Sequence, residues 1–578
     1  MHHYTCANCY SSNLSKCGKM VRSGIKCQRY KCIDCFKDKN QTKYTYVPLD
    51  SPLPDGYREI NDIVRKHEKY DTARAHARQR AAARSKDEFS SNESQQEYII
   101  PDLDFDDIIS KVDYIRDDYW VESKLKAKKF VITSAQSDTN VDKEFFDSLK
   151  NYCRVNKAEL LIIPVKYKNP TLQEESNTTC YYDPIIQPYL FENNIKLHEK
   201  LKVMGSIKIS ATAENPLSGL APLSKGDSVI IGHNQLQMLT LPVQPDDFPV
   251  IMSTTGSVSE KNYSISKQGH KGEFNHSKSA VIVELDDDIF HIRHLNFDGI
   301  GFYDIYRYYE KDIVREASGH VKALVTGDEH VTFFSEEVYD ATYSEIGIVA
   351  ELKPEFIVRH DVLDCYSITH HHKKNFLTKF KKYINETNNV TDELKETIDF
   401  VIATTPETST NIIVSSNHND HLIKWLNECD IKTEPWNAIT YHYIMFKMLS
   451  EISKDSSYIP NPFELYSSGV FKKNNCKVDF ISRRSSYKIF DIEIAIHGDK
   501  GINGARGSRE SFAKLPSKTI IGHSHSPGIE KGCYQTGTSS ILNLEYNDGP
   551  SSWLNTHCLI YANGKRQLIN IIKGKWKA

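Results

Sequence analysis

The sequence predicts an α/β protein with layered sheets, on three observations. From residue 322 onward, strand-like runs such as KALVT, EFIVR, NIIVSS, FDIEIAI and KTIIG alternate with helical stretches. Residues 129–165 contain KFVITSA, EFFDSLKNYCRVN and ELLIIPV, the pattern of a strand, an amphipathic helix and a second strand. Between residues 200 and 300, β-branched runs are separated by Gly, Asn and Asp turns, which indicates mostly strands.

Length and charge limit how the chain can be organised. Its 578 residues allow several domains. We expect a zinc module at 1–45, a basic helical segment with a linker at 46–127, an α/β and β-rich accessory region at 128–315, and a catalytic domain at 316–578. The 73 Lys and Arg nearly balance the 76 Asp and Glu, so any basic surface for nucleic acid must be local.

The chain has no feature of an exported or membrane-spanning protein. No apolar run approaches the ~18 to 20 residues that cross a bilayer. The first residues, MHHYTCANCYSS, lack the basic and then apolar layout of a signal peptide. We therefore expect a cytoplasmic protein without a membrane span.

Six of the 13 cysteines crowd into the first 35 residues, which predicts a metal-binding module in a reducing compartment. Cys6 and Cys9 form one C-x-x-C pair, and Cys32 and Cys35 form a second, at the spacing of a four-thiolate zinc ribbon. We expect these four cysteines to hold one structural Zn²⁺. A rival pairing that uses Cys27 stays open. The stretch GIKCQRYKCIDCFKD resembles the second knuckle of transposase-type zinc ribbons.

The segment after the cysteines is helical and basic. Residues 57–86 contain the pattern of two helices broken near Tyr70 and Asp71, which indicates a candidate helix-turn-helix. Its second helix carries Arg74, Arg78, Arg80 and Arg84. Basic residues of this kind neutralise phosphates, so we expect this part of the chain to bind DNA. The alternative is a ribbon that is only structural or docks a protein.

Each strand-like run after residue 322 ends in residues that can bind a metal. The runs lead into GDEH, HDVLD, SNHND, a single histidine and GHSHSP, and loops at the carboxyl ends of strands are where α/β folds place their sites. Taken singly, each cluster is more often solvated or hydrogen-bonded than a ligand, but five in succession predict one centre. Mixed N and O ligands suit Mn, Fe, Zn or Mg. The candidate ligands are Asp328, His330, Asp361, Asn417, His497, His523 and His525.

The order of these clusters (D-x-H, D-x-x-D, N-H, a distant H, G-H-x-H) resembles the calcineurin-like metallophosphoesterases, including the Mre-type nucleases. The resemblance covers about residues 322–538 and implies a layered β-sandwich flanked by helices. It also implies two divalent cations, for which we expect Mn²⁺, bridged by Asp361. In this family pattern the first cation is held by Asp328, His330, Asp361 and His525, and the second by Asp361, Asn417, His497 and His523.

The same resemblance makes His418 the catalytic imidazole, which would protonate or stabilise the leaving oxygen. Two cations about 3.5 to 4 Å apart would lower the pKa of a shared water and neutralise the phosphoryl oxygens. The sequence departs from the family pattern at His360, where the family has Gly, and at Asn419, where it has an acid. The second change leaves open which carboxylate orients His418, and Asp364 and Asp420 are the candidates.

Two further segments between the clusters carry residues of interest. The loop HGDKGINGARGSRESF would offer Arg506 and Arg509 to phosphate, or it is a flexible solvated loop. The tract of His370, His371 and His372 opens the Lys-rich stretch HHHKKNFLTKFKKY. We interpret this tract as a solvated helix face near DNA and not as a third metal site.

A phosphodiesterase centre joined to a basic zinc module predicts a metal-dependent deoxyribonuclease. Middle segments such as NPLSGLAPLSKGDSVIIGH and FHIRHLNFDGIGFYD resemble the pre-early DNA-transfer deoxyribonucleases of tailed phages, which implies degradation of host DNA in the bacterial cytoplasm. One alternative is a phosphomonoesterase or cyclic-nucleotide phosphodiesterase acting on a small molecule, and another is a non-catalytic DNA-binding or DNA-transfer scaffold. Nucleases of this class commonly work as symmetric assemblies, so we expect a homo-oligomer.

Overall fold

The computed structural model describes residues 127–169, 180–245, 247–316, 321–544 and 547–578, together with the backbone of three earlier strands. The chain divides into two compact units, Met1–Phe105 and Asp106–Ala578. The first unit contains an antiparallel sheet of β1 (Leu14–Arg22), β2 (Ile25–Cys32) and β3 (Tyr44–Pro48). The predicted zinc ligands Cys6, Cys9 and Cys35, the side chain of Cys32 and the predicted helix-turn-helix lie outside the described residues.

The second unit begins with the predicted strand–helix–strand unit, which the structure confirms. The strands β4 (Lys129–Gln136) and β5 (Glu159–Val165) pair in parallel, and α5 (Lys143–Asn156) connects them. Asp142 caps the helix by accepting from the Phe145 backbone N–H, and Phe145, Leu149 and Tyr152 face the core at helical spacing. The strands β11 (Ser279–Asp286) and β12 (Ile289–Asn296) complete a four-stranded sheet in the order β12-β11-β4-β5.

A ten-stranded sheet follows the order β20-β21-β22-β24-β23-β9-β10-β8-β7-β6. Its strands are β6 (Asn194–His198), β7 (Leu201–Met204), β8 (Ser228–Ile231), β9 (Gln237–Leu241), β10 (Val250–Thr254), β20 (Lys488–Ile489), β21 (Ile492–Glu493), β22 (Lys518–Ile521), β23 (Gly528–Glu530) and β24 (Cys533–Gln535). Where β23 pairs with β9, Ile529 lies opposite Met238. The regions 128–315 and 316–578 therefore share one sheet.

A six-stranded sheet carries the first three ligand clusters. Its order is β19 (Val478–Ile481), β18 (Thr410–Val414), β17 (Phe356–Arg359), β16 (Val321–Val325), β25 (Thr556–Tyr561) and β26 (Arg566–Asn570). The strands β16 to β19 pair in parallel. Both faces of these strands are covered, one by helices and the other by the neighbouring sheets, so the strands are nearly continuous apolar runs such as FIVR and NIIV.

Helices cover one face of this sheet, the face that carries Leu324, Ile357 and Ile413. The side chains of α7 (Glu336–Tyr343) and α8 (Ile348–Leu352) pack on this face in a cluster with Leu324 and Ile357. On the same face, α10 (Val390–Ala403), α11 (Asn417–Glu428), α12 (Ala438–Lys454) and α13 (Pro462–Lys473) pack in a cluster with Ile413, whereas Val325, Val358 and Ile412 on the opposite face pack against the other sheets. The remaining elements are α6 (Lys267–Asn275), β13 (Phe302–Asp304), β14 (Arg307–Glu310), β15 (Ile313–Glu316), α9 (Phe376–Ile384) and α14 (Arg509–Phe512).

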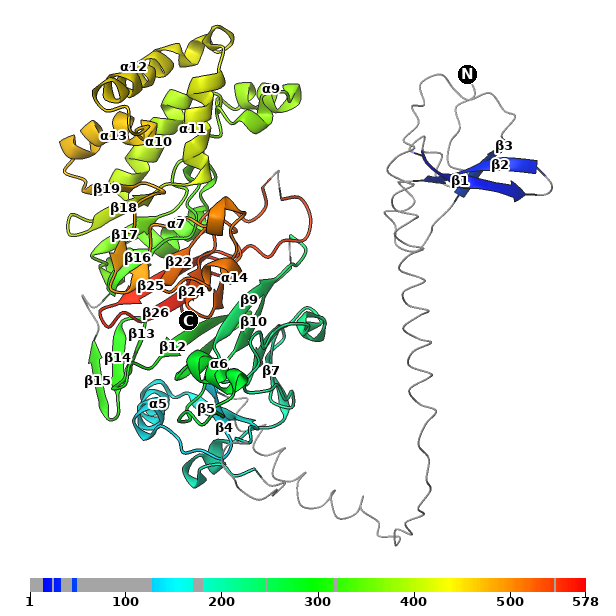
Figure 1. Cartoon of the computed structure of the whole chain (residues 1–578), viewed down its shortest axis with the longest axis vertical. Helices are drawn as coiled ribbons and strands as arrows, with labels where there is room; N and C mark the ends of the chain where they lie inside the picture. Colours follow the sequence, from blue (N-terminus) through cyan, green and yellow to red (C-terminus); the bar gives the residue numbers. More distant parts are fainter. Residues whose placement is uncertain are drawn as a thin grey trace. The chain divides into compact units, whose positions relative to one another are not determined.

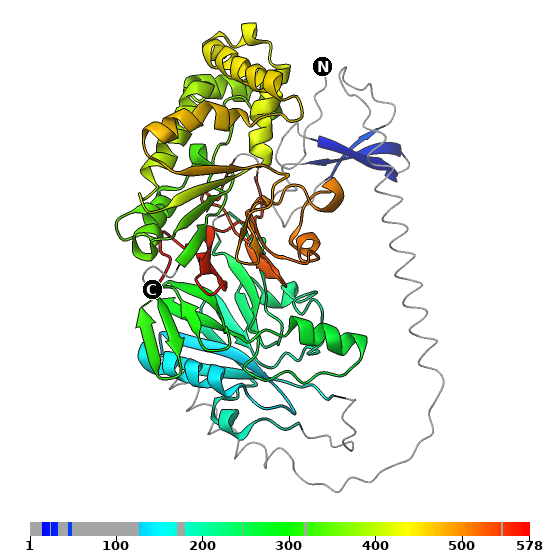
Figure 2. The same ribbon diagram turned by 60° about the vertical axis from the view of Figure 1, so that its left-hand side comes forward.

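Figure 1 shows α10 to α13 gathered at one end of this second unit and β4, β5 and α5 at the other, and Figure 2 shows the same separation from another direction. The sheets lie between these ends and share one hydrophobic cluster, which includes Ile132, Ile251, Val325, Ile520 and Ile560. The prediction of a mixed α/β protein with several sheets is confirmed. Among the described residues, no helix is both long and apolar enough to cross a membrane.

Candidate metal centre

The candidate ligands lie where strands of both large sheets end. Because β16, β17 and β18 are parallel neighbours, their carboxyl ends meet at one edge. Asp328 and Asp361 follow the first two of these strands, and Asn417 begins α11 after the third. The ten-stranded sheet adds His497, which follows β21, and the G-H-x-H segment that follows β22. The two sheets thus bring side chains from five loops to one place.

The first ligand group consists of Asp328, His330, Asp361 and His525. One ligand atom from each of these buried residues lies within 4.8 Å of the others. The Nε2 atoms of His330 and His525 are 3.0 Å apart, and His525 Nε2 lies 3.2 Å from Asp328 Oδ2. His330 Nε2 lies 3.8 Å from Asp361 Oδ2. The structure therefore brings together the four residues that the sequence assigns to one cation.

The second ligand group contains Asp361, Asn417 and His497. His497 Nε2 lies 3.0 Å from Asp361 Oδ2 and 3.1 Å from Asn417 Oδ1. The ring of His523 lies beside that of His497, with 5.2 Å between the centroids, and its backbone N–H donates to Asp328 Oδ2 at 2.6 Å. Asp361 Oδ2 faces both groups, so this carboxylate lies at the junction between them.

The unpaired atoms of these groups are those that a cation would satisfy. Asp328 Oδ1 and Asp361 Oδ1 are buried without a hydrogen-bond partner in the part of the chain that the structure describes. Buried carboxylates are normally paired or coordinate a metal. His330 donates through Nδ1 to Asp364 Oδ1 at 2.7 Å, which directs Nε2 at its neighbours in the group, where a cation would replace the Nε2 proton. The buried His and Asp groups could therefore hold a metal ion.

The electrostatics of the site also favour a cation. Burial works against the charged form of His330, yet Asp364 and Asp361 raise its pKa to about 9. Burial likewise works against ionised Asp361, but His497 and His418 hold the pKa of that carboxyl well below its usual range. The carboxylates therefore stay ionised and stabilise positive charge among them.

The backbone is strained at several candidate ligands. His330, Asp361, His523 and His525 have φ angles of 45°, 45°, 73° and 58°, in the left-handed region that side chains disfavour. Such strain persists only where the surrounding structure holds the residue in place. Gly522 lies against the centre, since a Cβ atom there would approach Asp328 Oδ1 to 2.2 Å. The glycine of the G-H-x-H motif is therefore required for this close approach.

Asp364 is the carboxylate that lies against His418. His418 Nδ1 lies 2.9 Å from the Asp364 carbonyl oxygen and 3.6 Å from its Oδ1. Because a carbonyl only accepts, Nδ1 carries the proton and Nε2 is left for a substrate. Asp420, the other candidate, instead pairs with Arg483 at 3.2 Å and Lys500 at 3.5 Å. The half-buried His418 is thus oriented from within the D-x-x-D motif.

Two supporting residues, Arg359 and Glu329, carry no motif that singles them out in the sequence. Arg359 donates through Nη1 to Glu329 Oε1 at 2.7 Å, through Nε to Asn411 Oδ1 at 2.7 Å and through Nη2 to Thr404 Oγ1 at 2.8 Å. These contacts connect the loop after β16 to the end of β17, the start of β18 and the C-cap of α10. One signal in the sequence could have found this pair. Arg359 is a basic residue at the end of the apolar strand FIVR, where its charge is buried and needs a partner.

His360, the residue that departs from the family pattern, lies inside the site. It groups with Asp328 and His497, and its Nδ1 lies 3.3 Å from His497 Nδ1. Burial, together with His497, lowers the pKa of His360 to about 4, so the ring is neutral. A neutral ring can accept the Nδ1 proton of His497, which would leave His497 Nε2 directed at Asp361.

The two loop arginines differ in their surroundings. Arg509 is half-buried and donates through Nη1 to the Ser526 carbonyl at 2.8 Å, so its guanidinium already binds the backbone. Arg506 is exposed on the loop. Of the pair, Arg506 is the one that is accessible to a phosphate group.

Comparison with known proteins identifies a relative that covers most of this chain. Protein A1 of Escherichia phage T5 is 33% identical to it over 468 residues, which are 78% of this chain and 83% of that protein. The similarity therefore extends far beyond one motif or module. No protein family model matches the chain, and no solved structure matches it.

Proposed function

The chain belongs to the family of Protein A1 of Escherichia phage T5, and on this premise we propose that it is a metal-dependent phage deoxyribonuclease that degrades host DNA early in infection. We assign residues 316–578 to the calcineurin-like metallophosphoesterase fold, because the ligands follow that family's order along the chain. The host cytoplasm would be its place of action.

The observation that carries this proposal is the carboxylate shared between two ligand groups. Asp361 Oδ2 lies 3.0 Å from His497 Nε2 and 3.8 Å from His330 Nε2, which belong to different groups. A bridging carboxylate between nitrogen and oxygen ligands is an arrangement suited to two divalent cations, and we expect Mn²⁺. When bound, such cations supply Lewis-acid activation of water and neutralise charge on a phosphate.

The chain's own residues would hold the cations and move one proton. The ligands are Asp328, His330, Asp361, Asn417, His497, His523 and His525. With both ring nitrogens protonated, His418 would give the Nε2 proton to the leaving oxygen and become a neutral ring that keeps its Nδ1–H on the Asp364 carbonyl. The side chain of His418 is 22% exposed, so a substrate can reach it.

DNA as the substrate is proposed from the sequence. Cys6, Cys9, Cys32 and Cys35 would hold one structural Zn²⁺, and the Lys and Arg residues around them would neutralise phosphates. In this division, the zinc module supplies affinity for DNA and the metal centre supplies hydrolysis. We further propose that the enzyme acts as a homo-oligomer.

The test is incubation of the full chain with linear plasmid DNA and Mn²⁺, with Asp361→Asn as the matched control. The proposal expects loss of the polymer with the parent chain and none with the variant, because Asn removes the bridging charge. Hydrolysis of a small phosphate ester with the plasmid left intact would instead favour a phosphomonoesterase or a cyclic-nucleotide phosphodiesterase. DNA binding without hydrolysis of either substrate would favour a scaffold.

A further inference from the structure

Three histidines from two distant segments meet beside the metal centre. His370 and His371 belong to the short 3-10 helix η4 (His370–His372), and His421 belongs to α11. One ring nitrogen from each lies within 4.8 Å of the others. The ring centroids of His370 and His371 are 3.9 Å apart, and that of His421 lies 5.1 and 5.5 Å from them. The three imidazoles thus converge on one point.

The nitrogens of this cluster are available as ligands. His370 Nδ1 and His421 Nδ1 are buried without a hydrogen-bond partner among the residues described. Burial lowers the pKa of His421 to about 3, with a smaller effect of His418, and burial also lowers the pKa of His370. Both rings are therefore neutral near pH 7, the state in which an imidazole has a lone pair for a metal.

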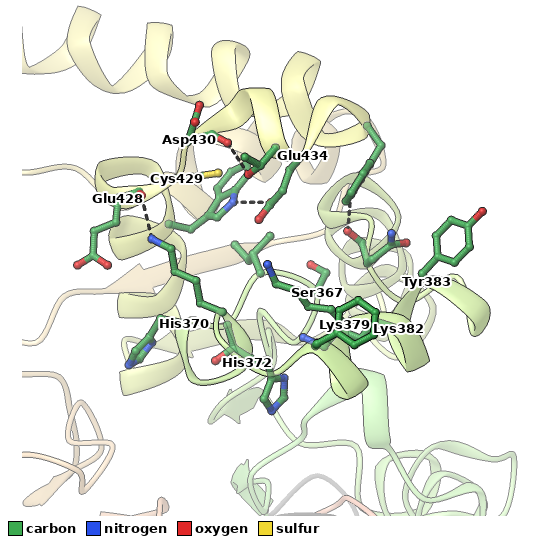
Figure 3. A pocket seen from close by; sticks show the side chains of 18 of the residues that line it. Ser367, His370, His372, Lys379, Lys382, Tyr383, Glu428, Cys429, Asp430 and Glu434 are labelled. Atoms are coloured by element: carbon green, nitrogen blue, oxygen red, sulfur yellow. Dashed lines mark hydrogen bonds between the residues drawn. The ribbon is translucent and has the colours of Figure 1, made fainter.

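The cluster shares no residue with the two ligand groups around Asp361. It is nonetheless close to them, because His421 follows His418 by three positions on α11 and their ring centroids are 5.1 Å apart. His370 also lines a cavity of about 510 Å³, together with Lys379, Lys382 and other residues. Figure 3 shows His370 and His372 along the lower edge of this cavity, away from Asp430 and Glu434.

We propose that His370, His371 and His421 form a further metal site, for a borderline divalent cation such as Zn²⁺. Imidazole ligands suit Zn²⁺, and three histidines leave a fourth position open for water or another oxygen ligand. Among the described residues, this group includes no carboxylate, so the site selects against the oxygen-preferring Mn²⁺ and Mg²⁺. The sequence alone favoured a solvated helix face, because the tract opens the Lys-rich stretch HHHKKNFLTKFKKY and nothing local points to His421.

The test counts bound metal in the full chain by equilibrium dialysis against Co²⁺, followed through its visible absorption, and against Zn²⁺. His371→Ala is the main variant, since this side chain is exposed and its loss spares the core. We expect this variant and His421→Ala each to bind one equivalent less than the parent chain. Affinity at this site should fall more than about 100-fold, because even changes beyond the ligands cost roughly 10- to 100-fold.

His372→Ala is the matched control, because this histidine belongs to the same tract but not to the cluster. It should bind as many equivalents as the parent chain. The proposal is overturned if His371→Ala binds the same number as the parent, or if His372→Ala is the variant that loses an equivalent. Counting bound metal with and without His371→Ala in the Asp361→Asn background separates this site from the proposed nuclease centre. The difference of one equivalent should persist in that background, although DNA cleavage is lost.

Discussion

Arg359 Nη1 lies 2.7 Å from Glu329 Oε1, and both side chains are completely buried. Glu329 stands between the candidate ligands Asp328 and His330, while Arg359 ends the strand that leads to Asp361. The ion pair therefore connects two of the loops that form the centre. Tyr343 strengthens it by donating its hydroxyl to Glu329 Oε1 at 2.6 Å.

Arg359→Ala should destabilise the fold strongly. The change would leave Glu329 as a buried carboxylate without its cation, and breaking a buried ion pair in this way costs about 3 to 5 kcal/mol. Urea unfolding followed by circular dichroism would measure the loss. Arg315→Ala is the control, since its pair with Glu310 is exposed and should contribute less than about 1 kcal/mol. Equal losses in the two variants would contradict the role assigned to the buried pair.

Asp364→Asn should weaken metal binding without removing a ligand. Asp364 Oδ1 accepts from His330 Nδ1 at 2.7 Å and so fixes the orientation of that ring. Loss of such a partner costs roughly 10- to 100-fold in metal affinity. Titration of the full chain with Mn²⁺ would measure it, and Asp420→Asn, which removes a partner of Arg483, should change affinity little. The reverse order of effects would be evidence against the assignment of Asp364.

His418→Ala should remove the proton donor and keep the ligands. A positioned general acid contributes typically about 10²- to 10⁴-fold, so cleavage of linear DNA should slow by a factor in that range. Mn²⁺ affinity should stay within a few-fold of the parent chain, because His418 is not among the proposed ligands. His270→Ala, on the exposed side of α6, is the control. Full activity in His418→Ala would rule out the proposed role.

The sequence predicted the features that are local along the chain. Apolar runs that end in D-x-H, in N-H or in G-H-x-H keep their ligands within a few residues of a strand end, so strand and ligand are recognised together. Parallel strands place such ends at one edge, which is why the amino-acid sequence alone assigns Asp328, Asp361 and Asn417 to one centre. The strand–helix–strand unit at 129–165 was likewise recognisable, because its periodicity changes within one short segment.

Features that depend on distant segments were not predictable. The pairing of β9 with β23, which joins the regions 128–315 and 316–578 in one sheet, leaves no local pattern in either strand. The Arg359–Glu329 pair and the approach of His421 to His370 depend in the same way on tertiary packing. The partner of His418 could be narrowed to Asp364 or Asp420, but only the fold decides between these two acids.

Acidic pH should destabilise the chain through the buried His557. Its Nδ1 accepts from the Gly327 backbone N–H at 2.9 Å, and its Nε2 donates to Thr342 Oγ1 at 2.9 Å, so the folded state requires the neutral ring. Burial lowers the pKa of His557 from 6.5 to about 3. Between these two values the unfolded chain binds a proton that the folded chain does not, and stability falls with falling pH.

Through His557, the free energy of unfolding should fall by about 1.4 kcal/mol for each pH unit of acidification between pH 6.5 and 3. Above that window His557 should make no contribution to the pH dependence. Urea unfolding at a series of pH values would measure it. His557→Gln should be less stable than the parent at a pH of about 7.5, because its amide cannot keep both hydrogen bonds at the same geometry. It should nevertheless lose less stability on acidification, because glutamine does not titrate. Equal acid slopes in the two proteins would show that the proton is taken up elsewhere.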